Sequence, residues 1–256
     1  MSFLSEIIER KHQRLGSTKR AIPIEALARR SQSHRFREAL LRDGLNIIAE
    51  FKRRSPSKGV IRAEADLSEI VKGYQAGGAS AISVLTEEDY FSGSLDDLRT
   101  AKSTIDLPVL RKDFIFDEYQ IYESAAAGAD AVLLIVAALD DAALLRLRRL
   151  AEDELGLDAL VEVHDGEEMK RAVACGAKVI GVNNRNLHTF EVSLETSVSL
   201  ASRAPKDAVL ISESGLNTAA DISRLYDAGY RGFLIGESLM RSENPEAALR
   251  RFMGRQ

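Results

Sequence analysis

Short apolar segments alternate with amphipathic segments along most of this chain, and that alternation restricts the fold more than any other feature. The apolar segments are residues 45–51, 79–85, 107–113, 129–135, 157–163, 177–183, 207–213 and 230–236. Segments with helical periodicity, such as LSEIVKGYQAGG, lie between them. Continuously apolar strands separated by helices are typical of a parallel sheet covered on its faces. Eight such units in 256 residues predict an α/β fold, a (β/α)8 TIM barrel, which usually needs about 250 residues.

Small-residue breaks announce four of the eight predicted strands. These breaks are AGGAS, AAGAD, ACGAK and DAGYRG, and they precede every second strand. Glycine suits the left-handed cap that ends a helix before the chain re-enters a sheet. The competing fold is an open doubly wound sheet, whose nucleotide fingerprint contains Gly-x-Gly. No two glycines stand two positions apart here, and Gly-Lys-Ser/Thr is also absent, so the barrel is favoured.

The first 40 residues precede the first predicted strand. They begin with MSFLSEIIERKHQR, which is amphipathic and charged. We expect residues 1–40 to form an N-terminal helical extension that closes the barrel or leans over one mouth. The whole chain, residues 1–256, is then expected to be a single barrel domain.

Composition excludes several classes of protein. The net charge is −4, whereas a protein that binds a polyanion is usually basic. A single cysteine rules out an intramolecular disulfide and fits a reducing compartment. The longest apolar run, residues 131–139, is far shorter than the roughly 20 residues of a membrane span, and the N-terminus lacks the apolar core of a secretion signal. We expect a cytoplasmic protein that binds neither membrane nor nucleic acid.

Charged and amide side chains follow the apolar segments where the strands should end. They are Glu50, Lys52, Lys112, Glu162, Asn183, Arg185 and Glu213. The carboxyl ends of barrel strands carry the chemistry in this fold, and period-two alternation places Glu50 and Lys52 on one face. A single such residue is more often an exposed loop charge. The same position in several repeats favours a shared pocket, where mixed lysine and glutamate suit general acid–base catalysis.

The last two predicted loops read SESG (212–215) and IGES (235–238). The loops after strands 7 and 8 frequently form the phosphate site of a TIM barrel. Glycine lets backbone N–H groups approach an anion, and serine adds a hydroxyl donor. Alone, Ser-Gly is usually a turn. In these two loops it predicts a phosphorylated small-molecule substrate.

The histidines and the cysteine predict no metal site. His12, His34 and His188 show no ligand spacing, and the chain has neither HExxH nor CxxC. His164 follows the fifth strand and is expected in a solvated loop. Cys175 is expected to be a packed thiol.

Several long motifs resemble the indole-3-glycerol phosphate synthase family of tryptophan biosynthesis. They are AEFKRRSPSKG, SVLTEEDYFSGS, LRKDFIFDEYQI, GADAVLLIV, VEVH, GVNNRNLHTFEV, ISESG and LIGESLM, spread in this order over residues 45–241. The resemblance implies a (β/α)8 barrel with an extra N-terminal helical segment. It also implies closure of the ring of 1-(2-carboxyphenylamino)-1-deoxyribulose 5-phosphate with loss of carbon dioxide and water, without a cofactor.

The resemblance assigns catalytic roles to the charged residues at the strand ends. Lys112 is the expected general acid, which protonates the substrate carbonyl oxygen. Glu162 is the expected general base of the later proton transfers. Lys52 binds anionic groups and assists the acid, Glu50 positions Lys52, and Glu213 supports the network.

The resemblance also assigns the substrate-binding residues. Asn183 and Arg185 are expected to hold the substrate's carboxylate and hydroxyls. The expected phosphate-binding residues are Ser55, Ser214, Gly215, Gly236 and Glu237, the last through its backbone N–H because the family varies at this position. Phe91, Phe114 and Leu133 are expected to line the slot for the aromatic ring. The resemblance leaves protein partners unknown.

Three other functions are weaker. A phosphoribosylanthranilate isomerase is expected to carry a cysteine on its first strand, where this chain has Glu50 and Lys52. A non-catalytic sensor of phosphorylated ligands needs no pair of inward lysines. The cationic run from Lys52 to Lys58 lacks the interleaved aromatic residues of a nucleic-acid site, so we expect Arg53, Arg54 and Lys58 to be rim or solvent charges.

Overall fold

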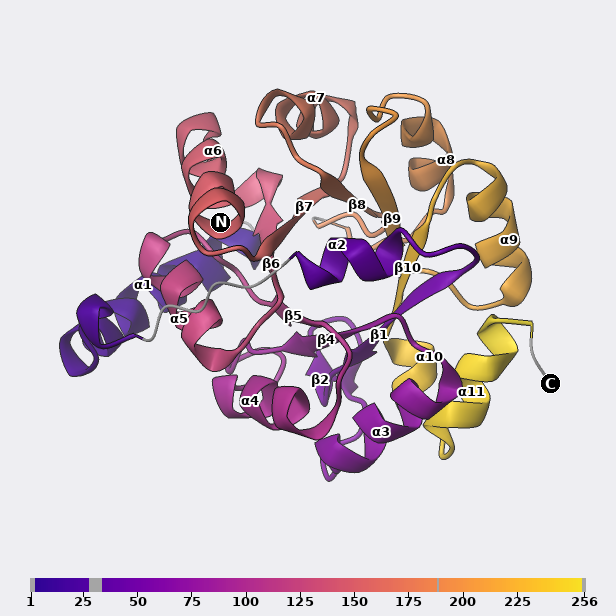
Figure 1. Ribbon diagram of the computed structural model, residues 1–256, viewed down its shortest axis with the longest axis horizontal. Helices are drawn as coiled ribbons and strands as arrows, with labels where there is room; N and C mark the ends of the chain where they lie inside the picture. Colours follow the sequence, from indigo (N-terminus) through magenta and orange to yellow (C-terminus); the bar gives the residue numbers. More distant parts are fainter. Residues whose placement is uncertain (1–2, 28–33, 188, 255–256) are drawn as a thin grey trace.

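Eight parallel strands form a closed barrel in the computed structural model, which describes residues 3–27, 34–187 and 189–254 (Figure 1). The strands are β1 (Asn46–Phe51), β4 (Ala81–Leu85), β5 (Val109–Lys112), β6 (Ala131–Ile135), β7 (Asp158–Val163), β8 (Val179–Asn183), β9 (Val209–Glu213) and β10 (Gly232–Ile235). Consecutive strands pair around the ring, and β1 pairs with both β4 and β10 to close it. Each predicted apolar segment contains one of these strands, so the predicted TIM barrel is confirmed.

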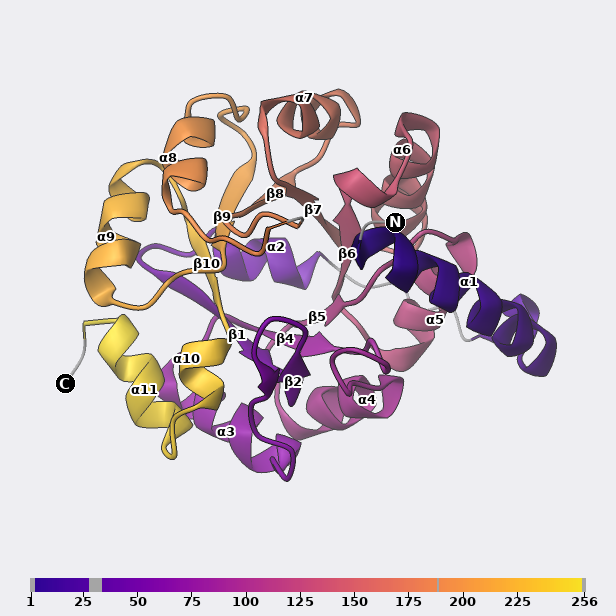
Figure 2. The ribbon, with the colours of Figure 1, turned by 180° about the vertical axis from the view of Figure 1, so that it is seen from behind.

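Helices surround this barrel on its outer face (Figures 1 and 2). They are α3 (Leu67–Gly77), α4 (Leu95–Thr104), α5 (Glu118–Ala127), α6 (Asp141–Arg149), α7 (Gly166–Ala174), α8 (Glu195–Ala201), α9 (Ala219–Asp227), α10 (Glu237–Met240) and α11 (Pro245–Phe252). Shorter turns are η2 (Val136–Ala138) and η3 (Leu150–Glu154), and a small hairpin of β2 (Arg54–Ser55) and β3 (Gly59–Val60) follows β1. None of the helices in the described part of the chain is long and apolar enough to cross a membrane.

Local sequence fixes where most of these helices begin and end. Asp66, Ser94, Asp117 and Asp140 each accept a backbone N–H of the first turn as N-cap residues. The predicted glycine breaks are confirmed, since each contains a glycine with positive φ between its helix and the next strand. These caps hold each helix to a defined length and return the chain to the barrel in register.

The pleat of the strands separates two layers of buried side chains. One apolar cluster fills the barrel and includes Ile48, Leu110 and Leu160. A larger one lies between the strands and the helices and includes Ile47, Val109 and Val161. Because successive side chains alternate between these layers, residues two positions beyond the interior ones face the mouth of the barrel.

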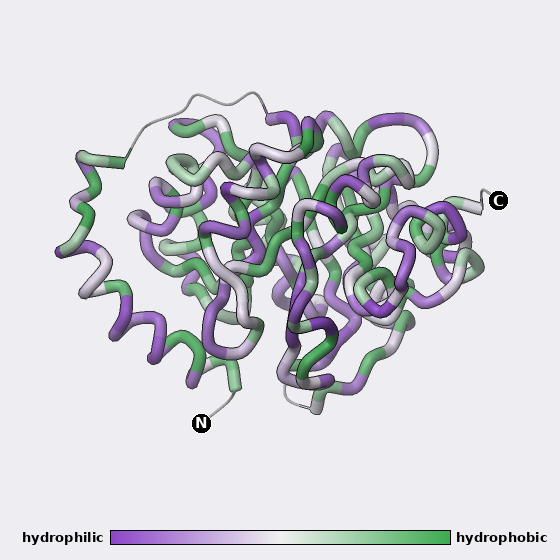
Figure 3. Tube along the Cα trace, turned by 90° about the horizontal axis from the view of Figure 1, so that it is seen from below, coloured by the Kyte–Doolittle hydropathy of each residue, from purple (hydrophilic) through white to green (hydrophobic). Residues whose placement is uncertain are grey.

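The N-terminal extension contributes two helices that lie on opposite sides of the barrel. In α2 (Arg35–Leu40), Phe36 and Leu40 join the interior cluster and plug the end where the strands begin. Helix α1 (Phe3–Ala21) lies on the opposite side, toward the viewer in Figure 2. Figure 3 shows it standing beside the barrel with hydrophilic and hydrophobic residues interleaved. Residues 1–2 and 28–33 of the predicted extension lie outside the described residues, as does His188.

Candidate functional site

A cavity of about 690 Å³ opens at the end of the barrel where the strands finish. All fifteen residues predicted for the site line it. The six predicted catalytic residues come from β1, β5, β7, β8, β9 and the position just after β1. The structure therefore brings the predicted set together, because each is the last inward-facing position of its strand or the next one beyond.

Lys112 lies between two buried carboxylates at the bottom of the cavity. Its Nζ is 2.5 Å from Glu213 Oε2 and 3.2 Å from Glu162 Oε2. The side chain of Lys112 is 15% exposed, whereas those of the two glutamates are 2–3% exposed. Lys112 is thus the most exposed side chain of this trio, although all three line the cavity.

A second ion pair lies next to the first. Lys52 Nζ is 2.5 Å from Glu50 Oε1, with Glu50 almost fully buried and Lys52 partly exposed. Strand alternation places both on the inner face, as predicted. Two glycines make room for these groups. A Cβ on Gly236 would lie 2.3 Å from Glu50 Oε1, and one on Gly181 would lie 2.1 Å from Glu213 Oε1.

The carboxylates that share Lys112 differ in basicity. Burial raises the pKa of Glu213 to about 7, against the opposing charge of Lys112. Burial also acts to raise the pKa of Glu162, but Lys112, His164 and a hydrogen bond from Asn183 outweigh it, and that pKa lies below its usual value. Burial acts to lower the pKa of Lys112, yet Glu213, Glu162 and Glu50 raise it above its usual value. The site therefore contains a cation, an ionised carboxylate and a carboxyl group that titrates near neutral pH.

Two loops and the β2–β3 hairpin form a polar corner of the cavity. Ser214 and Gly215 are consecutive residues with φ of 67° and 79°, both in the left-handed region that glycine adopts most readily. Gly236 and Glu237 follow β10, the neighbouring strand, and Ser55 is buried in the hairpin. Lys58 and Arg241 stand at this rim and both contact Glu237, at 3.9 Å and 3.1 Å.

Aromatic and aliphatic side chains form the other wall. The Phe91 and Phe114 rings lie 6.3 Å apart between centroids, and Leu133 lines the same cavity. Sequence reasoning missed Phe3, Leu187 and Phe190, which complete this wall. Phe3 of α1 meets Phe190 at 5.6 Å. No local pattern marks these residues, because their contact depends on where α1 lies.

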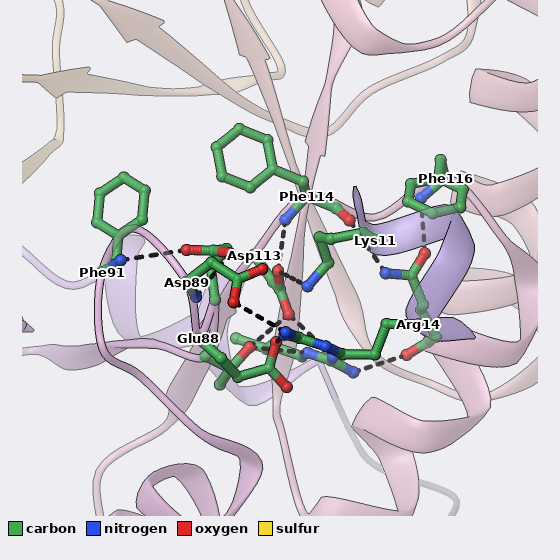
Figure 4. A network of polar contacts seen from close by, with 12 residues as sticks. Lys11, Arg14, Glu88, Asp89, Phe91, Asp113, Phe114 and Phe116 are labelled. Atoms are coloured by element: carbon green, nitrogen blue, oxygen red, sulfur yellow. Dashed lines mark hydrogen bonds and ion pairs between the residues drawn. The ribbon is translucent and has the colours of Figure 1, made fainter. Parts of the chain in front are cut away.

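Ion pairs fasten α1 to the loops that carry the aromatic wall (Figure 4). Lys11 Nζ lies 2.6 Å from Asp113 Oδ1, and both side chains are buried. Arg14 pairs with Glu88 and Asp89. Asp113 directly follows Lys112, the last residue of β5. The contact between Lys11 and Asp113 therefore connects α1 to the end of the strand that carries Lys112.

One expectation about an individual charge is wrong. His164 is not in a solvated loop, since its side chain is 12% exposed and lies between Glu162 and Glu168. Glu168, four residues later on the first turn of α7, buries the ring by binding Nδ1. Arg53 forms a two-pronged contact with Asp97 at 2.7 and 2.8 Å, and 24% of its side chain is exposed. Cys175 is buried, as expected.

The described residues contain no cluster of three or more His, Cys, Asp or Glu side chains arranged to hold a metal ion.

Known proteins resemble this chain in sequence along nearly its whole length. Residues 4–252 match the family model described as indole-3-glycerol phosphate synthase. Proteins named indole-3-glycerol phosphate synthase are 48% identical in Bacteroides thetaiotaomicron, over 98% of this chain and 97% of that protein, and 47% identical in Koribacter versatilis, over 99% of both.

Solved structures resemble the fold at much lower identity. A thiamine phosphate pyrophosphorylase from Pyrococcus furiosus superimposes with a TM-score of 0.62 at 17% identity, over 82% of this chain and 94% of that one. KGPDC from Streptococcus mutans gives a TM-score of 0.62 at 13% identity, over 83% and 97%. These two likenesses support the barrel fold alone.

Proposed function

The chain belongs to the indole-3-glycerol phosphate synthase family, and we propose that the cavity at the mouth of its barrel is where it carries out that reaction. The enzyme is a carboxy-lyase of tryptophan biosynthesis. It closes the ring of 1-(2-carboxyphenylamino)-1-deoxyribulose 5-phosphate to indole-3-glycerol phosphate, and carbon dioxide and water leave. The observation that carries the placement is the Lys112 ammonium, which lies between two buried carboxylates in a cavity that has an aromatic wall.

Lys112 is the general acid of this proposal. Attack of the aromatic carbon on the ribulose carbonyl develops negative charge on the carbonyl oxygen. A fixed ammonium stabilises that charge and donates a proton to the oxygen. The raised pKa of Lys112 keeps it protonated in the free enzyme, and Glu162 and Glu213 hold its Nζ in place.

Glu162 is the general base of the later steps. Carbon dioxide leaves the aromatic carbon that formed the new bond, and its bonding electron pair restores the aromatic ring, so this step releases no proton. The hydroxyl made from the carbonyl oxygen then leaves as water, which requires a proton to leave the neighbouring ring carbon, and an ionised carboxylate can accept that proton. Glu162 contacts the acid, so a proton taken by one group can be returned by the other. Lys52, held by Glu50, is placed to bind the substrate's anionic groups and to assist the acid.

The remaining residues bind the substrate in this proposal. Asn183 and Arg185 hold the carboxylate and hydroxyls, and carbon dioxide leaves next to an apolar wall of Phe91, Phe114 and Leu133. The polar corner takes the phosphate. Its members are Ser55, Ser214, Gly215, Gly236 and the backbone of Glu237.

The turnover assay tests this proposal directly. Purified protein mixed with the carboxyphenylamino-deoxyribulose phosphate should generate indole fluorescence, and inorganic phosphate should inhibit competitively. Absence of turnover by folded protein would overturn the reaction. Non-competitive inhibition by phosphate would instead place the phosphate outside this cavity.

A further inference from the structure

His164 lies directly behind Glu162 and is absent from the described residues that line the cavity. It follows β7, and its ring is held from two sides. Glu168 Oε2 lies 3.0 Å from Nδ1 and also accepts the backbone N–H of His164 at 2.7 Å. On the other side, Nε2 lies 3.3 Å from Glu162 Oε1. The ring therefore bridges a carboxylate of α7 and a carboxylate of the cavity.

The second of these contacts is short enough for an ion pair but lacks the alignment of a hydrogen bond. Nε2 is buried and has no aligned partner among the described residues. A buried N–H is costly to leave without a counter-charge, so a charged Glu162 is the partner that this position favours. Burial acts to lower the pKa of His164. Glu162 and Glu168 outweigh the effect of burial and raise this pKa to about 10.

The distances to Lys112 alone would predict that Glu213, and not Glu162, is the ionised carboxylate. Glu213 lies nearer to Lys112 than Glu162 does, at 2.5 Å against 3.2 Å. One lysine cannot fully stabilise two buried carboxylates, and one of them is expected to hold a proton. Glu162 faces His164 and Asn183 in addition to Lys112, whereas Glu213 faces Lys112 and the negative charges of Glu162 and Glu50.

We propose that His164 is a positioning residue which keeps Glu162, rather than Glu213, as the ionised carboxylate at the bottom of the cavity. It does so as an imidazolium held by Glu168, from the side away from the substrate. This inference rests on the proposed role of Glu162 as general base. It adds a residue that touches no substrate but decides which of two neighbouring glutamates can accept a proton.

The first experiment measures the charge of the ring without measuring activity. The chain has four histidines, so nitrogen NMR of histidine-labelled protein gives four rings, and the H164N spectrum identifies His164. Both ring nitrogens of His164 should be protonated at pH 8. Glu168→Gln, which keeps the ring, should lower its titration midpoint. A neutral His164 ring at pH 8 in the wild-type protein would overturn the proposal, whether or not H164N folds.

The second experiment measures the pH dependence of kcat/KM. Without the imidazolium, Glu162 should need a higher pH to ionise, since an opposite charge at this range is worth about one to three pKa units. The acid limb of H164N should move up by that amount, with a fall in kcat larger than the change in KM. The matched control is H34N, because His34 also faces a carboxylate, Asp158 at 3.1 Å, at the other end of the barrel. Its profile should match that of the wild type.

Failure of this inference is distinguishable from failure of the proposed function. If Glu162→Gln abolishes turnover while folded H164N keeps the wild-type acid limb, Glu162 is the base and His164 does not set its charge. If Glu162→Gln retains full turnover, the base has been assigned to the wrong residue and the premise fails with it.

Discussion

Two buried charge clusters meet on strand β5 and point in opposite directions. The inner cluster, defined as Glu50, Lys52, Lys112, Glu162 and Glu213, lines the cavity. The outer cluster is Arg111 and Asp113 with the groups that bind them, Lys11, Thr86 and Glu123. Both pair cationic with acidic side chains around the end of one strand. The pleat alone sends Lys112 inward and its two neighbours outward.

The clusters differ in how completely their charges are satisfied. Arg111 donates to Thr86, Gln120, Ser124 and Asp113 and also pairs with Glu123. In the inner cluster, Glu213 Oε1 has no hydrogen-bond partner among the described residues. The lysines there are also partly open to the cavity. A satisfied buried cluster holds structure together, whereas an unsatisfied one beside a cavity keeps groups available for chemistry.

The largest expected effect removes the cation of the inner cluster. Lys112→Met should lower kcat by about 10²–10⁴-fold, the range for general acid catalysis, while the protein still folds and binds substrate. The indole fluorescence assay measures kcat and KM separately. The matched control is Lys102→Met, because Lys102 also pairs with a buried aspartate, Asp130, but away from the cavity. If Lys112→Met turned over substrate about as fast as Lys102→Met, the inner cluster would have no catalytic role to distinguish it from the outer cluster.

Removing the buried arginine of the outer cluster should lower the stability of the fold, without acting on the chemical step. Arg111→Met leaves Glu123 without its buried partner and Asp113 with only Lys11 as a cation. Removing one member of a buried ion pair typically costs about 3–5 kcal/mol of unfolding free energy. Urea denaturation measures this loss. Arg99→Met, at an exposed pair with Asp96, should cost at most about 1 kcal/mol. Equal losses in the two variants would show that the outer cluster does not hold the fold together.

The raised pKa of Glu213 predicts that the inner cluster lowers the free energy of unfolding more at high pH than at low pH. Its folded value of about 7 lies above its ordinary value of 4.5, so the folded protein binds this proton more tightly than the unfolded chain. Stability should therefore fall as pH rises from about 4.5 to about 7, by an amount on the order of 3 kcal/mol at 1.36 kcal/mol per unit. Glu213→Gln should remove this part of the pH dependence in urea denaturation, and Glu195→Gln, at an exposed position, should not. A Glu213→Gln curve parallel to that of the wild type would contradict the raised pKa.

The inner cluster could be predicted from the sequence because the barrel is regular, whereas the outer cluster could not. Each apolar segment predicted one strand, and period-two alternation then predicted that Glu50 and Lys52 share a face. Position after a strand predicted Lys112, Glu162 and Glu213 in the same way. These inferences needed only local pattern and the rule that strand ends converge.

Contacts between distant segments could not be predicted in that way. Lys11 and Asp113 are 102 positions apart, and nothing in either neighbourhood indicates that α1 will pair with β5. Phe3 and Phe190 are hidden for the same reason. His164 had one local signal, a glutamate four residues later, but the burial of its ring depends on how α7 returns against β7.

The smallest expected effect lies at the rim, where charges are open to water. Glu237 is 31% exposed and contacts both Lys58 and Arg241 at the polar corner. If the burial of a charged group, and not the number of its charged partners, determines how much its loss costs, Glu237→Gln should have only a small effect on the kinetic constants. It frees two cations beside the proposed phosphate position, so KM and the inhibition constant for inorganic phosphate should both fall by about two- to five-fold, since exposed pairs are worth at most about 1 kcal/mol. The effect should shrink as salt is raised, because screening acts on exposed charges.

Measuring both constants at low and high salt separates this outcome from a loss of fold, and the control is Glu246→Gln, whose pair with Arg250 lies on α11. A change in kcat as large as that of Lys112→Met would mean that the rim carboxylate belongs with the inner cluster and that burial is not what separates them.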